Sequence, residues 1–201
     1  MKINVGMLTA ILMIGLFLGM DQETFAQSMA KKFKVLDVER VMPFPAEKVW
    51  AAVARDYGKI AESHPRIVHS DYEAGSLKGE LGAQRMCAFN DKGTQVLHEK
   101  IVDWDEENMT FVNMVLEAKK FPINEDNTRA IYKVTPIDAN TSKLSMHMEF
   151  RTSPAFMGGM MKGSFEKLLN DYMIAVEHNI KTGEAVNRDN FKDIRKQYAS
   201  K

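Results

Sequence analysis

The sequence predicts a single α+β domain, in which an antiparallel sheet is covered on one face by a long C-terminal helix. Residues 66–151 form successive runs of mostly alternating apolar and polar side chains separated by short turns, which is typical of strands joined in hairpins. Residues 154–182 repeat apolar side chains at spacings of three and four, which is typical of an amphipathic helix. One face of such a sheet must be covered, and only this helix is long enough to lie across it.

The first elements are a strand and two short helices. After the strand over residues 33–42, Pro45 suits a first helical turn, Val49, Trp50 and Val53 give an apolar stripe, and Gly58 ends the helix. A second short helical turn is expected before Pro65. Six further strands then follow in hairpin order, over residues 66–75, 83–90, 94–105, 109–117, 128–138 and 142–151.

The long helix has an unusual beginning. Ser153 is a plausible N-cap and Pro154 a suitable first residue. Three glycines weaken the turns that follow, which we interpret as allowing a bend or a close approach to the sheet or to a ligand. Methionines in the same turns would fill irregular space around different ligands. These residues are Gly158, Gly159 and Gly163, and Met157, Met160 and Met161.

Composition excludes one class of partner. The chain has 201 residues, of which 45% are hydrophobic, and 27 basic side chains balance 27 acidic ones. Because no basic excess is available to hold a phosphate backbone, we expect no nucleic-acid partner. We expect a domain over residues 33–183, a polar tail over 184–201, and a monomer or weak dimer.

The first 26 residues have the layout of a secretory signal. Lys2 precedes the uncharged run "VGMLTAILMIGLFLGM", and Thr24 and Ala26 occupy the small-residue positions of a cleavage site. The run has 16 residues (5–20), against about 20 for a comfortable membrane span. We therefore expect cleavage near Ala26, a periplasmic or secreted protein, and no stable membrane span afterwards, with an uncleaved anchor as the alternative.

Four segments, in this order, resemble the START-like (SRPBCC) superfamily and its polyketide-cyclase-like branch. "PAEKVWAAVARDYGKI" is similar to the first helix of that branch, and "HPRIVHSDYEAGSLKGELGAQRM" to its second and third strands, with Gly79, Gly82 and Arg85 in place. "LHEKIVDWDEENMTF" and "FPINEDNTRAIYKVTPID" resemble the strands and loop that follow. The resemblance covers about residues 34–182.

The resemblance implies a helix-grip fold, with a seven-stranded sheet curved around the C-terminal helix and a cavity between them. Members bind sterols, lipids, polyketides or hormones there, and a minority catalyse a reaction. Two departures are visible. Met146 and Met148 stand where members often carry tryptophan, and the hairpin at Asp91 is too short for the mobile gate of the plant hormone receptors.

Candidate pocket residues follow from strand faces and from the resemblance. Apolarity does not choose a face for Glu99, but the family's glutamate at this position points into the pocket, where a carboxylate must be paired, hydrogen-bonded or protonated. A surface salt bridge is the alternative for Glu99. Apolarity favours Val112 and Met114 on the next strand, whereas the family pattern turns the alternate residues inward. Following the family, we expect a small hydrophobic ligand to contact Glu99, Ile101, Phe111, Asn113, Val115, Tyr132, Met146, Met148, Met157, Met161, Phe165, Leu168 and Tyr172.

The sequence gives little support for a cysteine nucleophile, a metal site or a catalytic histidine. Cys87 is the only cysteine and is interpreted as a buried thiol. The five histidines show no HxH or HExxH spacing, so we expect no metal and no cofactor. His64 could act as an acid or base near the pocket mouth, although a histidine in a loop or at a helix end is the simpler interpretation.

Three functions stay open from the sequence. The first is binding of a small hydrophobic ligand. The second is a cyclase or dehydratase that uses Glu99, Tyr132 or Arg85 around a bound carbonyl. The third is a protein-interaction module without an open cavity.

Overall fold

The structure is a computed structural model that describes residues 33–198, so the expected signal segment lies outside the described residues. Seven strands pair into one antiparallel sheet in the order β1-β7-β6-β5-β4-β3-β2. From β2 to β7, neighbours along the chain are neighbours in the sheet, as expected for hairpins. Strand β1 pairs with β7, so β1 and β2 form the two edges of the sheet. The strands are β1 (Lys34–Met42), β2 (His69–Glu73), β3 (Gln84–Ala88), β4 (Val96–Asp105), β5 (Thr110–Lys119), β6 (Arg129–Asp138) and β7 (Thr141–Phe150).

Short helical segments connect β1 to β2. Helix α2 (Ala46–Trp50) continues into one wide turn, η2 (Ala51–Arg55), and a tighter segment, η3 (Tyr57–Glu62), follows. Val49, Trp50 and Val53 are buried as the stripe predicted. A further short turn, η4 (Glu125–Asn127), lies in the loop before β6.

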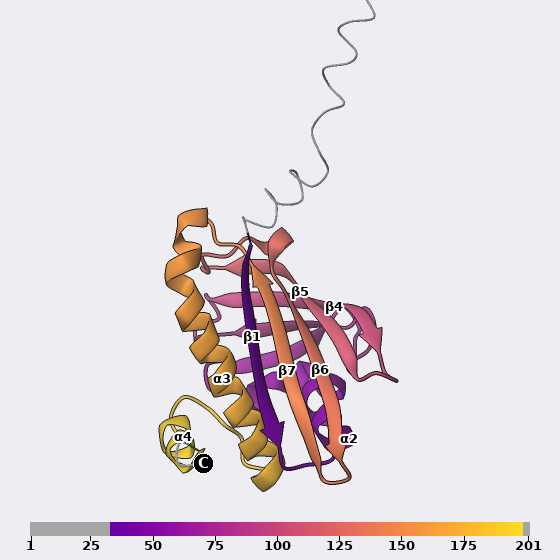
Figure 1. Ribbon diagram of the computed structural model, residues 1–201. Helices are drawn as coiled ribbons and strands as arrows, with labels where there is room; N and C mark the ends of the chain where they lie inside the picture. The colour runs from indigo at the N-terminus through magenta and orange to yellow at the C-terminus, as the bar shows by residue number, and fades with distance from the viewer. Residues whose placement is uncertain (1–32, 199–201) are drawn as a thin grey trace, which may run out of the picture. The chain divides into compact units, whose positions relative to one another are not determined.

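Helix α3 (Gly158–Thr182) runs beside β1 along one margin of the sheet, and the sheet curves so that its β2–β4 side passes behind the helix (Figure 1). The helix ends where Gly183 takes a left-handed conformation with φ of +73°, and its N–H donates to the carbonyl of Asn179. This arrangement is the helix-grip fold, and the α+β prediction is confirmed.

The beginning of α3 differs from the prediction. Ser153 makes no cap, because a tight turn, η5 (Ala155–Met157), comes first and α3 starts only at Gly158. A side chain added at Gly159 or Gly163 would meet no atom within 4 Å. The interpretation that these two glycines permit a close approach is therefore wrong.

Two separate apolar clusters stabilise the described part of the chain. The main core lies between the concave face of the sheet, the segments α2 to η3, and the second half of α3. The second cluster joins α3 to helix α4 (Phe191–Tyr198) through Ala175, Val186, Phe191, Ile194 and Tyr198. The polar tail thus contributes a helix with one buried side.

Among residues 33–198, no helix is both long enough and apolar enough to cross a bilayer.

Candidate ligand-binding site

A cavity of about 120 Å³ lies between the concave face of the sheet and α3. Strands β3 to β7 supply one wall, and Phe165, Leu168, Leu169 and Tyr172 of α3 supply another. Residues from η3 and the loop after it, including Ile60 and His64, close a third side. The lining is mostly apolar, with a small polar cluster.

Nine of the predicted ligand contacts line this cavity. The strand faces explain why: Glu99, Asn113 and Val115 are all buried, whereas Leu116 on the alternate face of β5 is exposed. Following the family pattern rather than apolarity therefore placed β5 on the correct face. The nine residues are Glu99, Asn113, Val115, Tyr132, Met146, Met148, Phe165, Leu168 and Tyr172.

Four predicted contacts lie elsewhere. Ile101 and Phe111 point inward, but they belong to the packed core, where the Phe111 ring stacks on Tyr132 with centroids 4.5 Å apart. Met157 and Met161 are only half-buried, because the first turns of α3 lie largely in solvent. Phe165, whose ring packs edge-on against Phe150, is the first residue of α3 that lines the cavity.

A hydrogen-bonded polar cluster occupies one wall. Arg85 Nε donates to Glu99 Oε2 at 2.8 Å, and Asn113 Nδ2 donates to Glu99 Oε1 at 2.7 Å. The Tyr57 hydroxyl donates to Asn113 Oδ1, and Arg85 Nη1 donates to the Tyr57 carbonyl at 2.8 Å. Both oxygens of Glu99 are thus occupied by groups of the protein itself, which meets the requirement for a buried carboxylate.

Residues 35–173 match the family described as polyketide cyclase/dehydrase and lipid transport. The chain belongs to that family, within the SRPBCC superfamily.

Solved SRPBCC structures share the fold at low identity. XoxI from Bacillus cereus is 17% identical, with a TM-score of 0.61 over 74% of this chain and 96% of its own. Zhui aromatase/cyclase from Streptomyces sp. R1128 is 11% identical, with a TM-score of 0.55 over 83% and 96%. Norcoclaurine synthase from Thalictrum flavum is 14% identical, with a TM-score of 0.56 over 74% and 94%. No curated protein matches the sequence.

Burial keeps the phenols of the cavity, and the Cys87 thiol in the neighbouring core, neutral. Burial raises the pKa of Tyr132 to about 12, although the nearby Arg85 charge opposes this. Burial also raises the pKa of Tyr172 and of the Cys87 thiol. Each phenol therefore offers a hydroxyl proton, and Cys87 is not activated as a nucleophile.

His64 lies in the loop just after η3, as the simpler interpretation expected, and it also lines the cavity. It is buried, and its Nδ1 accepts the backbone N–H groups of Arg66 and Ile67, both at 3.1 Å. Burial first, then the charges of Arg85 and Arg66, lower its pKa to about 3. A neutral ring that accepts at Nδ1 carries its proton on Nε2, so His64 is a donor rather than an acid or base near neutral pH.

Arg85 was named for its place in the family pattern and for the enzyme alternative but not as a ligand contact, yet it is central to the site. The signal for Arg85 was its place in the family pattern, and the signal for His64 was its position just before Pro65. Neither pattern showed that the two side chains meet the same cavity. The other histidines lie apart from it: His98 contacts Glu73, and His147 contacts Asp37.

No group of three or more His, Cys, Asp and Glu side chains within residues 33–198 is placed to hold a metal ion.

Proposed function

We propose that this SRPBCC protein binds a small apolar molecule, of which a part about the size of an aromatic ring enters the cavity. The observation that supports this most is the cavity itself, an apolar space beside a few fixed polar groups. Such a combination is typical of small-molecule sites.

The volume limits what enters. A cavity of about 120 Å³ resembles the engineered apolar cavities of about 150 Å³ that take up benzene. It is smaller than the roughly 300–1,000 Å³ of pockets that enclose a drug-sized ligand. We therefore infer that a larger ligand extends beyond the cavity or displaces Met148, Phe165 or Leu168, which are only half-buried.

The polar groups fit recognition better than catalysis. Glu99 is held by Arg85 and Asn113, so it lacks the free oxygen that a general base directs at its substrate. His64 stays neutral, and the phenols of Tyr132 and Tyr172 remain protonated. These groups suit a ligand with a carbonyl or another hydrogen-bond acceptor.

The test is saturable binding of the neutral dye N-phenyl-1-naphthylamine, measured by fluorescence titration. Ala130 lines the cavity, so Ala130→Leu fills part of it. We expect this variant to bind the dye at least about tenfold more weakly, the scale of a few buried methylene contacts. Ala185→Leu, at an exposed position, is the matched control and should leave the affinity unchanged.

Two results would contradict the proposal. Absence of saturable binding by the unmodified protein would support the interaction module without an open cavity. Conversion of a bound carbonyl compound, seen by mass spectrometry and lost in Glu99→Gln, would support the cyclase or dehydratase.

Met161→Phe should leave dye binding unaffected, because Met161 does not line the cavity.

A further inference from the structure

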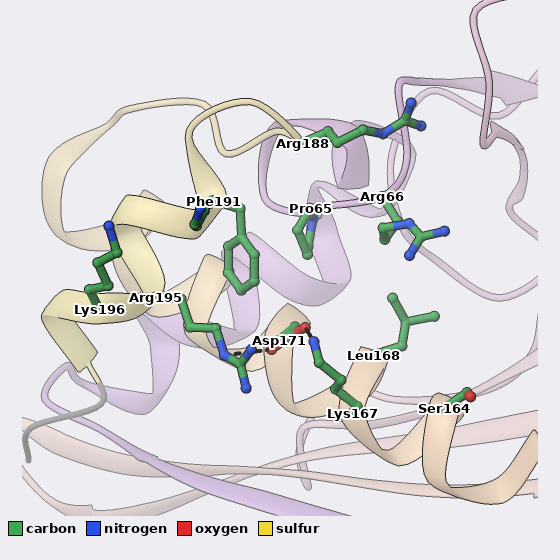
Figure 2. A pocket seen from close by; sticks show the side chains of 11 residues that line it. Pro65, Arg66, Ser164, Lys167, Leu168, Asp171, Arg188, Phe191, Arg195 and Lys196 are labelled. Carbon is green, nitrogen blue, oxygen red and sulfur yellow. Dashed lines mark hydrogen bonds and ion pairs between the residues drawn. The ribbon is translucent and has the colours of Figure 1, made fainter.

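A second, larger hollow lies outside the sheet, between α3, α4 and the loop at Pro65 and Arg66. Its volume is about 680 Å³, and Pro65, Leu168 and Phe191 give it an apolar floor. Figure 2 shows the side chains that surround it, which come from all three segments. Its charged lining consists of one carboxylate, Asp171, and six cations: Arg66, Lys167, Arg188, Lys192, Arg195 and Lys196. We call this hollow the cationic groove.

Half of these cations have a carboxylate partner. Asp171 pairs with both Lys167 and Arg195 (Figure 2), and Lys196 pairs with Asp193 at 2.7 Å. Within residues 33–198, no carboxylate lies within ion-pair distance of the other three, Arg66, Arg188 and Lys192.

The cationic groove has an excess of positive charge, whereas the chain as a whole has equal numbers of acidic and basic side chains. Grouped cations repel one another and attract anions into a concave site. The two arginines add planar groups of N–H donors that match the oxygens of a carboxylate or a phosphate. The cationic groove is therefore suited to an anionic group.

The groove adjoins the apolar cavity. Leu168 lines both spaces, so at that point they are separated by one side chain. His64 lines the cavity, and the next two residues line the groove. Arg188 Nη2 donates at 3.1 Å to the carbonyl of Phe89, which also lines the cavity. The apolar cavity and the cationic groove are therefore neighbouring spaces.

We propose that the ligand is an amphiphilic anion, whose apolar end occupies the cavity and whose carboxylate or phosphate lies in the cationic groove beside Arg66 and Arg188. This inference rests on the proposed function of the cavity. It accounts for the small cavity volume, because the remainder of the ligand passes Leu168 and lies on the apolar floor of the groove.

The experiment compares matched acids and alcohols by displacement of N-phenyl-1-naphthylamine. We expect 8-phenyloctanoate to bind at least tenfold more tightly than 8-phenyloctan-1-ol at low salt. This preference should shrink in 0.5 M sodium chloride, which screens exposed charges. The short pair, 3-phenylpropanoate and 3-phenylpropan-1-ol, should show no preference for the acid, because its carboxylate does not reach past Leu168.

The double variant Arg66→Gln/Arg188→Gln should reduce the preference for the long acid to less than threefold and leave alcohol binding unchanged. Lys100→Gln/Lys133→Gln is the control. It removes an equal number of positive charges from the outer face of the sheet and should keep the preference for the long acid. Thermal unfolding of each variant checks that the fold is retained.

The remaining outcomes separate this inference from the proposed function. Equal affinity for long acid and long alcohol overturns the inference and leaves the cavity as a binding site. Absence of any dye or ligand binding overturns both. If inorganic phosphate or vesicles containing phosphatidylglycerol bind through Arg66 and Arg188 while the long acid has no advantage, the groove holds a free anion or a membrane surface, and the inference is wrong.

Discussion

Glu99 is a negative charge inside the domain, and its position depends on an irregularity in β4. The register of β4 against β5 shifts between His98 and Glu99, and Glu99 then faces the cavity beside Arg85. Because both partners are buried, removing either charge leaves the other without compensation. This pair should therefore contribute to stability as well as to the site.

We expect Glu99→Gln to lower the free energy of unfolding by about 3 kcal/mol, the scale for breaking a buried ion pair. Urea unfolding measures it. Glu117→Gln is the control, because Glu117 is an exposed partner of Lys119 and its loss should change stability by less than about 1 kcal/mol. Equal effects of the two substitutions would show that the Arg85–Glu99 pair does not stabilise the fold.

His64 makes stability depend on pH. Its pKa falls from 6.5 to about 3 in the folded protein, so the unfolded chain binds the proton more readily. The stabilising contribution is fully present above pH 6.5 and is lost progressively as the pH falls towards 3.

Between pH 7 and pH 4.5 we expect a loss of about 2–3 kcal/mol from this residue, at roughly 1.4 kcal/mol for each pKa unit. His64→Asn should unfold with a flatter pH dependence, measured by urea titration at each pH. His69→Gln, at an exposed position, should keep the slope of the unmodified protein. The same slope in His64→Asn would mean that His64 takes up its proton without unfolding the chain.

At the scale of elements, two glycines have opposite roles. A Cβ at Gly79 would lie 1.7 Å from the carbonyl oxygen of Ala54 in η2, so only glycine lets this loop pack there. A Cβ at Gly163 in α3 would meet nothing within 4 Å. The first glycine is required by packing, and the second only adds conformational freedom to the unfolded chain.

Gly79→Ala should therefore destabilise the protein by about 2–3 kcal/mol, the scale of a backbone clash. Gly163→Ala should stabilise it by about 0.5–1 kcal/mol, the difference in helix propensity. Differential scanning calorimetry of both variants tests the contrast. A lower melting temperature for Gly163→Ala would restore the interpretation that the helix needs this glycine.

The elements also show what the sequence could predict. Alternation and turn residues located all seven strands and the long helix, because these patterns depend on local geometry. Apolarity favoured the wrong face of β5, because Val112 and Met114 are more apolar than the inward-facing Asn113, and the family pattern was needed. The sequence patterns also could not show how far α3 reaches over the sheet, because that depends on η5, and so Met157 and Met161 were misplaced.

At the scale of the whole molecule, residues 33–198 combine a packed core with the small apolar cavity beside it. The neighbouring cationic groove depends on α4, which belongs to the segment expected to be a polar tail. The cationic groove could not be predicted from the net charge, because composition does not show which charged side chains lie close together in the fold.

Export is a separate proposal at this scale. We propose that the protein acts outside the cytoplasm and that the mature chain begins near Gln27, because Lys2, the apolar run and Ala26 have the layout of a cleavable signal. Intact mass spectrometry of protein exported by its own host should give a chain of residues 27–201. A membrane-free mature form that still carries Met1 would contradict cleavage.

The first half of α3 is more exposed than the second half. Phe156 in η5 and Met160 in the first turn of α3 are 78% and 77% exposed, whereas Tyr172, Met173 and Val176 are buried. Helical turns with few buried contacts unfold locally at low cost. We expect amide hydrogens in residues 160–168 to exchange with deuterium faster than those in 172–180, and a bound ligand to slow exchange around Leu168. We propose that the cavity opens by fraying of the helix that covers it, rather than by movement of the short hairpin at Asp91.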